Sequence, residues 1–203
     1  MAEKTVVVVS GAAPLSNVAL SAIPRGAPVI GADAGVDHAR AAGLEVTLAV
    51  GDFDSAVSLG DVPAERHPRE KDATDLELAL HTALAFEPER LLVVSGAGAR
   101  LDHLVAELGL IAADAFAGID VDAVFDETLV HVVRRERRVE GTVGALISLV
   151  PMHGRAEGVT TDGLVYPLRD ETLDAGSTRG VSNVFAEPEA RIRVERGVLL
   201  ALR

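Results

Sequence analysis

The sequence predicts an α/β N-terminal domain with a mostly parallel, Rossmann-like sheet over residues 1–127, followed by an all-β sandwich over residues 128–203. In the first part, short β-branched runs alternate with segments of helical period, which is the pattern of βαβ units. After Glu127 the helical spacing stops, and short alternating segments are separated by turns that contain glycine. The chain has 203 residues, 48% of them hydrophobic, which is enough to bury both cores.

The N-terminal elements follow one another at short intervals. Residues 5–9 form a nearly pure valine run, which is typical of a strand covered on both faces. Further strands are expected at residues 29–32, 46–50, 91–94 and 121–125. Helices are expected at residues 15–23, at 36–42 before Gly43, and on the apolar faces that run over 76–84 and 101–115.

The C-terminal elements are all strands. Alternating segments at residues 128–133, 145–150 and 191–194 predict half-exposed antiparallel strands. Residues 190–202, interrupted near 195–197, predict a hairpin that closes the sandwich.

The composition excludes several classes of function. A net charge of −12 and a pI near 4.9 argue against a protein that binds nucleic acid through a basic face. The absence of cysteine excludes disulfides, thiolate nucleophiles and cysteine-bound metals. Because the sequence shows neither a membrane-spanning apolar run nor a secretory signal, we expect a soluble, cytoplasmic protein without a membrane partner.

Carboxylates follow the predicted strands, at the sheet edge where open parallel sheets bind ligands. Asp33 follows the second strand, Asp52 and Asp54 follow the third in the segment Gly-Asp-Phe-Asp-Ser, and Asp75 stands at a helix start after Lys71. If residues 52–54 are extended, both of their carboxylates point to one side. Such acids would repel one another unless a divalent cation compensates them, and oxygen ligands favour Mg²⁺ held together with phosphates.

Each acidic group also has a simpler interpretation. Asp72 with Asp75 could cap a helix, and the Gly-Asp-x-Asp-Ser segment could be an ordinary turn. Three acidic groups at successive strand ends are hard to explain as three independent turns. Their convergence therefore favours a magnesium-nucleotide site.

A glycine loop follows the fourth strand and contains Gly96, Gly98 and Arg100. Small residues before a helix start let backbone N–H groups approach phosphate, and an arginine can grip phosphate with two parallel hydrogen bonds. The loop fits neither the Gly-x-Gly-x-x-Gly pattern nor a P-loop, so a tight turn is the alternative. Taken singly, Asp102 is typical of a helix start and His103 of a surface histidine.

Taken together, these motifs resemble the thiamine pyrophosphokinase family over nearly the whole chain. Six segments match in order: residues 31–35 the family's Ala-Asp-Gly-Gly segment, 50–55 Val-Gly-Asp-Phe-Asp-Ser, 71–80 Lys-Asp-x-Thr-Asp-x-Glu-x-Ala-Leu, 96–103 Gly-x-x-Gly-Gly-Arg-Leu-Asp-His, 163–168 Gly-Leu-x-Tyr/Trp-Pro-Leu and 181–183 Ile-Ser-Asn. The resemblance implies a homodimer with active sites between subunits, and a reaction in which ATP and thiamine give AMP and thiamine diphosphate with Mg²⁺.

The resemblance also suggests roles for the singled-out residues. Our hypothesis is that Asp52, Asp54 and Asp75 hold Mg²⁺ with Asp33 nearby, and that Lys71 and Arg100 contact phosphates. The nucleotide pocket would be completed by three further groups, namely Asp102, His103 and the loop glycines Gly96 and Gly98. In the last third, the resemblance suggests that Tyr166 stacks on thiamine while Ser182 and Asn183 make polar contacts.

The chain departs from the family pattern at a few positions, which keeps two other functions open. Ala34 and Ala99 replace glycines, residues 104–107 (Leu-Val-Ala-Glu) replace Thr-Leu-Ala-Asn, and residues 46–47 (Val-Thr) replace Pro-Asp. One alternative is a pyrophosphokinase for another heterocyclic alcohol, such as a hydroxymethylpterin. The other is a module that binds thiamine or a nucleotide without turnover.

Overall fold

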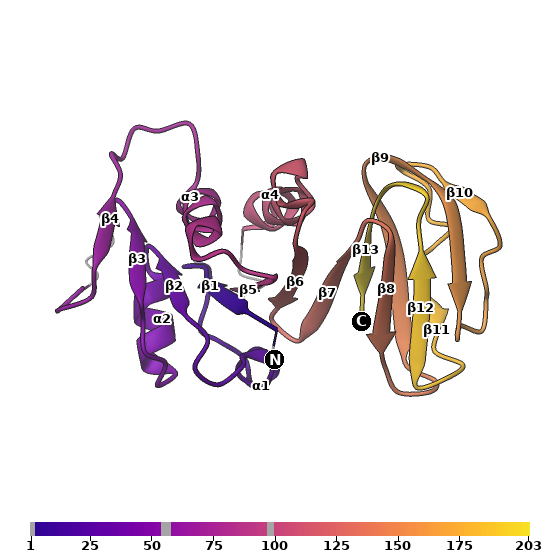
Figure 1. Cartoon of the computed structure of the whole chain (residues 1–203), viewed down its shortest axis with the longest axis horizontal. Helices are drawn as coiled ribbons and strands as arrows, with labels where there is room; N and C mark the ends of the chain where they lie inside the picture. Colours follow the sequence, from indigo (N-terminus) through magenta and orange to yellow (C-terminus); the bar gives the residue numbers. More distant parts are fainter. Residues whose placement is uncertain (1–2, 54–57, 97–99) are drawn as a thin grey trace. The chain divides into compact units, whose positions relative to one another are not determined.

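The computed structural model describes residues 3–53, 58–96 and 100–203. The chain divides into two compact units (Figure 1). The first consists of Met1–Leu110 and Gly118–Glu127, and the second of Ile111–Ala117 and Thr128–Arg203. Within the described residues, no helix has the length and apolar character needed to span a bilayer.

The first unit is built on a parallel sheet. Its strands lie in the order β4-β3-β2-β1-β5-β6, and the pairings between these neighbours are parallel. Their bounds are β1 Thr5–Val9, β2 Val29–Ala32, β3 Leu48–Gly51, β4 Ala64–Arg66, β5 Arg90–Ser95 and β6 Asp120–Phe125. All five residues of β1 are buried, which accounts for the valine run, because this central strand is covered on both faces.

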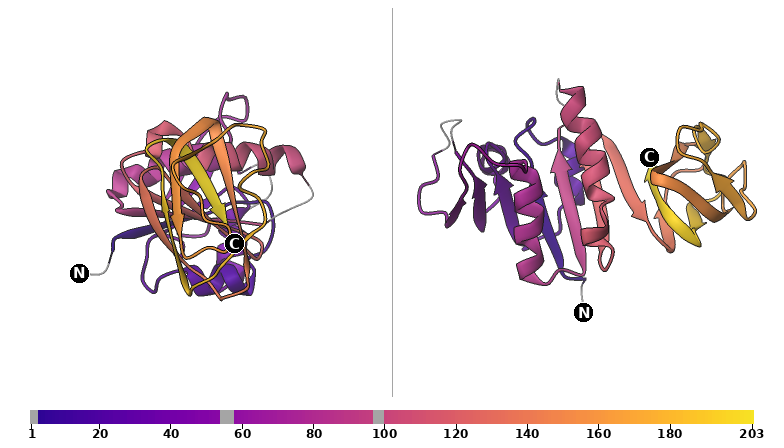
Figure 2. Two further views of the ribbon diagram at one scale, coloured as in Figure 1. Left: turned by 90° about the vertical axis from the view of Figure 1, so that its right-hand side faces the viewer. Right: turned by 90° about the horizontal axis from the view of Figure 1, so that it is seen from above.

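Helices cover both faces of this sheet. Their bounds are α1 Asn17–Ala22, α2 Gly35–Ala41, α3 Asp75–Ala83 and α4 Leu101–Ile111, with a short 3₁₀ turn η1 Leu84–Phe86, while the 3₁₀ turn η2 Asp114–Phe116 belongs to the second unit. Figure 1 shows α1 and α2 on one face and α3 and α4 on the other, and the right-hand view of Figure 2 looks down onto α3 and α4. Gly35, the first residue of α2, packs directly against the end of β1. A Cβ at this position would overlap the Val9 carbonyl oxygen, so glycine is needed for this close packing.

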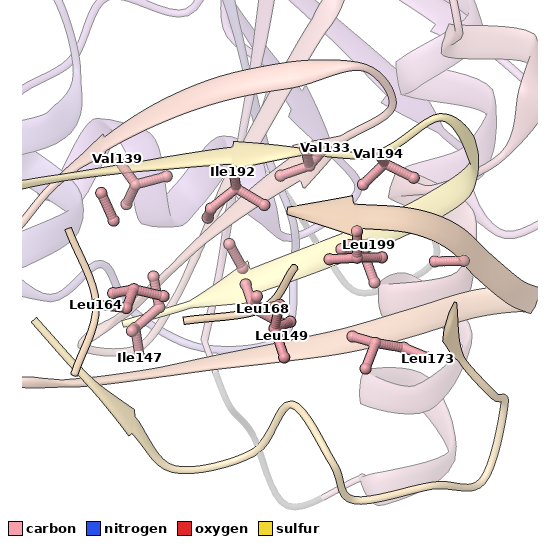
Figure 3. Close-up of a cluster of buried hydrophobic side chains, with 14 of the residues drawn as sticks. Val133, Val139, Ile147, Leu149, Leu164, Leu168, Leu173, Ile192, Val194 and Leu199 are labelled. Carbon is pink, nitrogen blue, oxygen red and sulfur yellow. The ribbon is translucent and has the colours of Figure 1, made fainter. Parts of the chain in front are cut away.

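The second unit consists mainly of antiparallel strands. They are β7 Thr128–Val133, β8 Glu136–Glu140, β9 Leu146–Asp162, β10 Glu171–Leu173, β11 Asn183–Val184, β12 Glu189–Arg193 and β13 Arg196–Leu202. The 17-residue strand β9 pairs with β13 along its first part and with β12 near its end. Apolar side chains from these strands point toward one another and form a buried core, which includes Ile147, Leu149, Ile192 and Leu199 (Figure 3).

The sequence prediction of a parallel α/β region followed by a β-rich region is confirmed. The predicted closing hairpin is wrong. In the described part of the chain, β12 pairs with β8 and β9, whereas β13 pairs with β7 and β9. Both halves of residues 190–202 are strands, as the sequence predicts, but β9 is long enough to pair with each of them, and the Val194 N–H donates to the Arg135 carbonyl.

Candidate active site

A pocket of about 400 Å³ opens in the first unit beyond the carboxyl ends of its central strands. Its walls come from the segments after β1 and β2, from the first turn of α3, and from one side of α4. The lining includes Ser10, Gly11, Asp33, Thr74, Asp75, Glu77, Gly96, Arg100, His103, Leu104, Glu107 and Leu110. This is the edge at which open parallel sheets bind ligands.

Gly51, the last residue of β3, brings two of the predicted acids together. An ideal Cβ on Gly51 would lie 3.1 Å from Asp75 Oδ1 and 3.3 Å from Asp33 Cα, so a side chain here would fill the space beside both residues. Gly51 has φ +151°, and Asp33 adopts a left-handed φ of +47° while its N–H donates to the Val50 carbonyl at 2.9 Å. A glycine is therefore required at this strand end.

Lys71 joins two carboxylates from separate elements. Its Nζ lies 3.0 Å from Asp52 Oδ2, just after β3, and 3.0 Å from Asp75 Oδ1 at the start of α3. The side chains are 13%, 14% and 23% exposed for Lys71, Asp52 and Asp75. Burial by itself lowers the pKa of Lys71, but the hydrogen bonds and charges of Asp75 and Asp52 outweigh it, and the pKa is raised above its ordinary value.

The helix-cap interpretation of the acids is wrong. The N-cap of α3 is Thr74, whose Oγ1 accepts a hydrogen bond from the Glu77 N–H at 3.2 Å. Asp72 precedes the helix and is exposed. Because Thr74 performs the capping, the Asp75 carboxylate is directed to Lys71 instead.

The segment after Asp52 is not extended as expected. Phe53 has a left-handed φ of +56°, and the guanidinium of Arg66 lies 5.0 Å from the centre of its ring. The predicted alternation of side chains therefore fails at Phe53, which makes a cation–π contact. Asp54 lies outside the described residues.

The carboxylates fit a divalent cation that takes its other ligands from substrate. Two carboxylate oxygens already surround one positive charge, and Gly51 leaves space beside Asp75. Among residues 3–53, 58–96 and 100–203, no three Asp, Glu or His side chains are grouped so as to hold a metal by themselves. Mg²⁺ commonly uses one or two carboxylates together with phosphates and water, so this donor set suits it.

The glycine loop borders the same pocket. Gly96 lines the pocket and packs so closely on the loop after β1 that a Cβ would overlap Ala13. Gly98 lies outside the described residues. Arg100 and His103 line the pocket, whereas Asp102 is exposed and accepts hydrogen bonds from Arg100 Nη2 at 2.6 Å and Nε at 3.2 Å. The hydrogen bond from Arg100 lowers the pKa of Asp102 to about 2.

The sequence prediction missed a hydrogen-bonded chain whose two end members, Ser10 and Glu107, line the pocket. Ser10 Oγ and Ser95 Oγ lie 2.7 Å apart, and Ser95 Oγ donates to Glu107 Oε2 at 2.8 Å. Burial raises the pKa of Glu107 above its ordinary value of 4.5. A serine follows or ends each of two strands, β1 and β5, and the parallel pairing of Val9 with Val94 sets both serines at one level. The serine at the end of each of these two strands is the sequence feature that could have indicated the hydrogen-bonded chain.

The three residues predicted to contact thiamine lie together in the second unit. Tyr166 is 59% exposed, whereas Asn183 is 5% exposed. Asn183 Oδ1 accepts from the Tyr166 N–H at 3.1 Å, and Asn183 Nδ2 donates to the Tyr166 carbonyl at 2.7 Å. Ser182 has a left-handed φ of +59°, and its N–H donates to Ser148 Oγ at 3.1 Å. The amide of Asn183 thus fixes the backbone that presents the Tyr166 ring.

Comparison with known proteins relates both units to a single protein family. The family model "Thiamin pyrophosphokinase, catalytic domain" matches residues 24–121, and "Thiamin pyrophosphokinase, vitamin B1 binding domain" matches residues 129–199. A relative named thiamine pyrophosphokinase, from Bacillus subtilis (strain 168), is 27% identical over 183 residues, which cover 86% of each chain.

Solved structures show the same fold. The chain aligns with thiamine pyrophosphokinase from Bacillus subtilis with a TM-score of 0.87 and 24% identity, covering 98% of each chain. It aligns with thiamin pyrophosphokinase from Geobacillus thermodenitrificans with a TM-score of 0.83 and 24% identity, covering 98% of this chain and 96% of that one. Because the two family models together span most of the sequence, this chain belongs to the thiamin pyrophosphokinase family.

Proposed function

We propose that this chain transfers the pyrophosphoryl group of ATP to the hydroxyl of thiamine, giving thiamine diphosphate and AMP, by means of the cluster formed by Lys71, Asp52 and Asp75. Membership of the family makes the chain a thiamine diphosphokinase. We assign residues 1–127 as a Rossmann-like nucleotide-binding and catalytic domain and residues 128–203 as a thiamine-binding β-sandwich. The observation that carries the proposal is the cation-bridged pair of carboxylates beside the strand-end pocket.

Asp52 and Asp75 would hold Mg²⁺, with Asp54 as a further ligand from the same segment and Asp33 nearby. Their support is the carboxylate donor set and the space that Gly51 leaves beside Asp75. When bound, the ion draws electron density from the phosphoryl oxygens and so makes the β-phosphorus easier to attack. These acids also orient the triphosphate chain, which is most of what phosphoryl transfer asks of a protein.

The glycine loop and the start of α4 would bind the rest of the nucleotide. Gly96 and Gly98 would let backbone N–H groups approach phosphate oxygens. The guanidinium of Arg100 would exchange its carboxylate partner, Asp102, for phosphate oxygens of the same geometry. His103 lines the pocket and would contact the nucleotide. Asp102 would hold the guanidinium of Arg100 in place until the nucleotide binds.

The reaction proceeds by in-line attack. The thiamine hydroxyl oxygen forms a bond to the β-phosphorus of ATP, and the bond from that phosphorus to the oxygen bridging the α-phosphate breaks, so that AMP leaves with the electron pair. The hydroxyl proton passes to a carboxylate of the acidic cluster. Lys71 and Arg100 provide positive charge toward the phosphoryl oxygens, where negative charge accumulates.

Thiamine would bind at the exposed ring of Tyr166. A cationic heterocycle is attracted to an aromatic face, and the net charge of −12 makes the surroundings favourable to a cation. Because both ends of the Asn183 amide are engaged with the Tyr166 backbone, we assign Asn183 a positioning role and leave the direct polar contact to Ser182.

A homodimer forms part of the proposal. Exposed apolar side chains occur beside both residues in the sequence, at Val165 and Val181, and also at Val143 and Leu146 near the start of β9, where Leu146 pairs with Val184 of β11. Such side chains are typical of a surface that a partner covers. Light scattering of the purified protein should give twice the mass of the chain, and a monomeric mass at micromolar concentration would contradict the assignment.

The decisive assay is AMP release from ATP in the presence and absence of thiamine. The proposal predicts that AMP is released only when thiamine is present, and that a hydroxymethylpterin cannot take the place of thiamine. Release with the pterin alone would favour the other pyrophosphokinase, and binding without release would favour the non-catalytic module. Asp54→Asn tests the metal role further, because wild-type kcat/KM at limiting Mg²⁺ would remove Asp54 from the proposed ligands.

A further inference from the structure

We propose that Lys71 is the resident counter-ion of Asp52 and Asp75, and that it keeps divalent metal off this pair until a nucleotide provides the ammonium with another anionic partner. The inference rests on the proposed function for the identity of the two carboxylates as metal ligands. It adds an order of events: metal binds together with the nucleotide rather than ahead of it.

The Lys71 ammonium occupies the position that a divalent cation bound by Asp52 and Asp75 would take. Lys71 Nζ lies 3.0 Å from an oxygen of each carboxylate, and these carboxylates come from the end of β3 and the start of α3. With 13% of the Lys71 side chain exposed, water screens the three charges only partly. The ammonium therefore cancels most of the repulsion that would otherwise separate Asp52 and Asp75.

The same arrangement makes metal binding conditional. An ion that takes these oxygens must displace the ammonium, and a mostly buried ammonium that loses its partners is costly. A bound triphosphate removes this cost, because the flexible lysine stem can carry the charge from carboxylate to phosphate oxygen. Metal affinity should consequently be low in the nucleotide-free protein and high when ATP is present.

The chain offers a matched control. Its sequence contains only two lysines, Lys71 and the exposed Lys4. Lys4→Met removes the same charge from the surface and leaves the acidic cluster intact. Any difference between Lys71→Met and Lys4→Met therefore reports the position of the charge rather than the net charge of the protein.

The experiment measures Mn²⁺ binding to the full-length, nucleotide-free protein by electron paramagnetic resonance. We expect Lys71→Met to bind Mn²⁺ about tenfold tighter than the wild type, while Lys4→Met binds as the wild type does. Adding a non-hydrolysable ATP analogue should tighten Mn²⁺ binding much more in the wild type than in Lys71→Met. Equal Mn²⁺ affinity of Lys71→Met and wild type without nucleotide would overturn the inference.

Thermal unfolding supplies a second measurement in case Lys71→Met is poorly folded. Lys71→Gln retains a polar side chain, and we expect Mn²⁺ alone to raise its unfolding midpoint, whereas the wild-type midpoint stays unchanged. A Mn²⁺-independent midpoint for Lys71→Gln would likewise count against the inference. The proposed function fails separately, if the wild type releases no AMP with thiamine, and that result leaves the Mn²⁺ comparison valid.

Discussion

The two candidate binding regions are held together in different ways. In the first unit, the charged groups of the acidic cluster hold one another, since Lys71 contacts both Asp52 and Asp75 and each side chain is mostly buried. In the second unit, the ring of Tyr166 is exposed, and this segment is held through its backbone. Its backbone is fixed by the buried amide of Asn183.

Because of this difference, substitutions in the two regions should affect stability and catalysis in different ways. In the acidic cluster the same atoms provide structure and chemistry, so a change should lower kcat and disturb the site together. Around Tyr166 the two tasks fall on different residues, so the ring can be removed without loss of fold, and the support can be removed without deleting the ring. The predictions below test that separation.

The largest effect is expected for Asp75→Asn. Asparagine keeps the size but removes the charge that faces Lys71 and the proposed metal, so kcat/KM for pyrophosphoryl transfer should fall by about 10²–10³-fold. Asp72→Asn is the control, because Asp72 is an exposed acid three residues earlier and should leave the rate near that of the wild type. Steady-state AMP release measures both, and an equal loss in the two variants would contradict the assignment of the cluster.

Asn183→Ala should next show what the support contributes. Removal of the amide leaves the Tyr166 N–H and carbonyl without their partner, at a cost of about 1–3 kcal/mol in the free energy of unfolding. Thermal denaturation followed by circular dichroism measures the change, with Thr178→Ala, at an exposed position of the same unit, as control. The thiamine KM should rise as well, because the ring loses its position. An unchanged unfolding midpoint would show that the amide does not support this segment.

Tyr166→Ala should have a smaller and more selective effect. Loss of one cation–π face is worth about 1 kcal/mol, so the thiamine KM should rise about fivefold while the ATP KM and the unfolding midpoint remain near wild type. Thr172→Ala, which trims an exposed side chain of β10 outside the proposed dimer surface, should change neither constant. If both Michaelis constants rise equally for Tyr166→Ala, the ring does not belong to the thiamine site.

The smallest effect concerns pH and Glu107. A carboxyl whose pKa is raised by burial binds its proton more readily in the folded than in the unfolded state, so stability falls as pH rises through the folded pKa. Glu107→Gln mimics the protonated form and can still accept the Ser95 hydrogen bond. It should be more stable than the wild type at about pH 8 and equal to it below about pH 4. A constant difference across this range would mean that Glu107 does not titrate as described.

Local patterns in the sequence were enough to predict the elements and the acidic strand ends. The valine run at 5–9 and the alternating run at 128–133 coincide with β1 and β7, because a buried central strand and a half-exposed strand each have their own period. Asp33, Asp52 and Asp75 stand directly after β2, directly after β3 and at the start of α3, as the sequence predicts, whereas the contact of Lys71 with Asp75 was not predicted. These predictions need only neighbours along the chain.

Contacts between distant segments could not be predicted in the same way. The predicted hairpin at 190–202 failed because strand pairing depends on the length of β9, which lies about 30 residues earlier. The chain from Ser10 through Ser95 to Glu107 requires β1 and β5 to be neighbours, which no local pattern states. The inward turn of the Asn183 amide toward Tyr166 depends on β11 lying beside β9.

The most direct test of the central claim is a crystal structure of the protein with Mg²⁺, a non-hydrolysable ATP analogue and thiamine. Our account predicts that Asp52 and Asp75 coordinate the ion and that Lys71 has moved to a phosphate oxygen. An ion bound elsewhere, with Lys71 still between the two carboxylates, would contradict it.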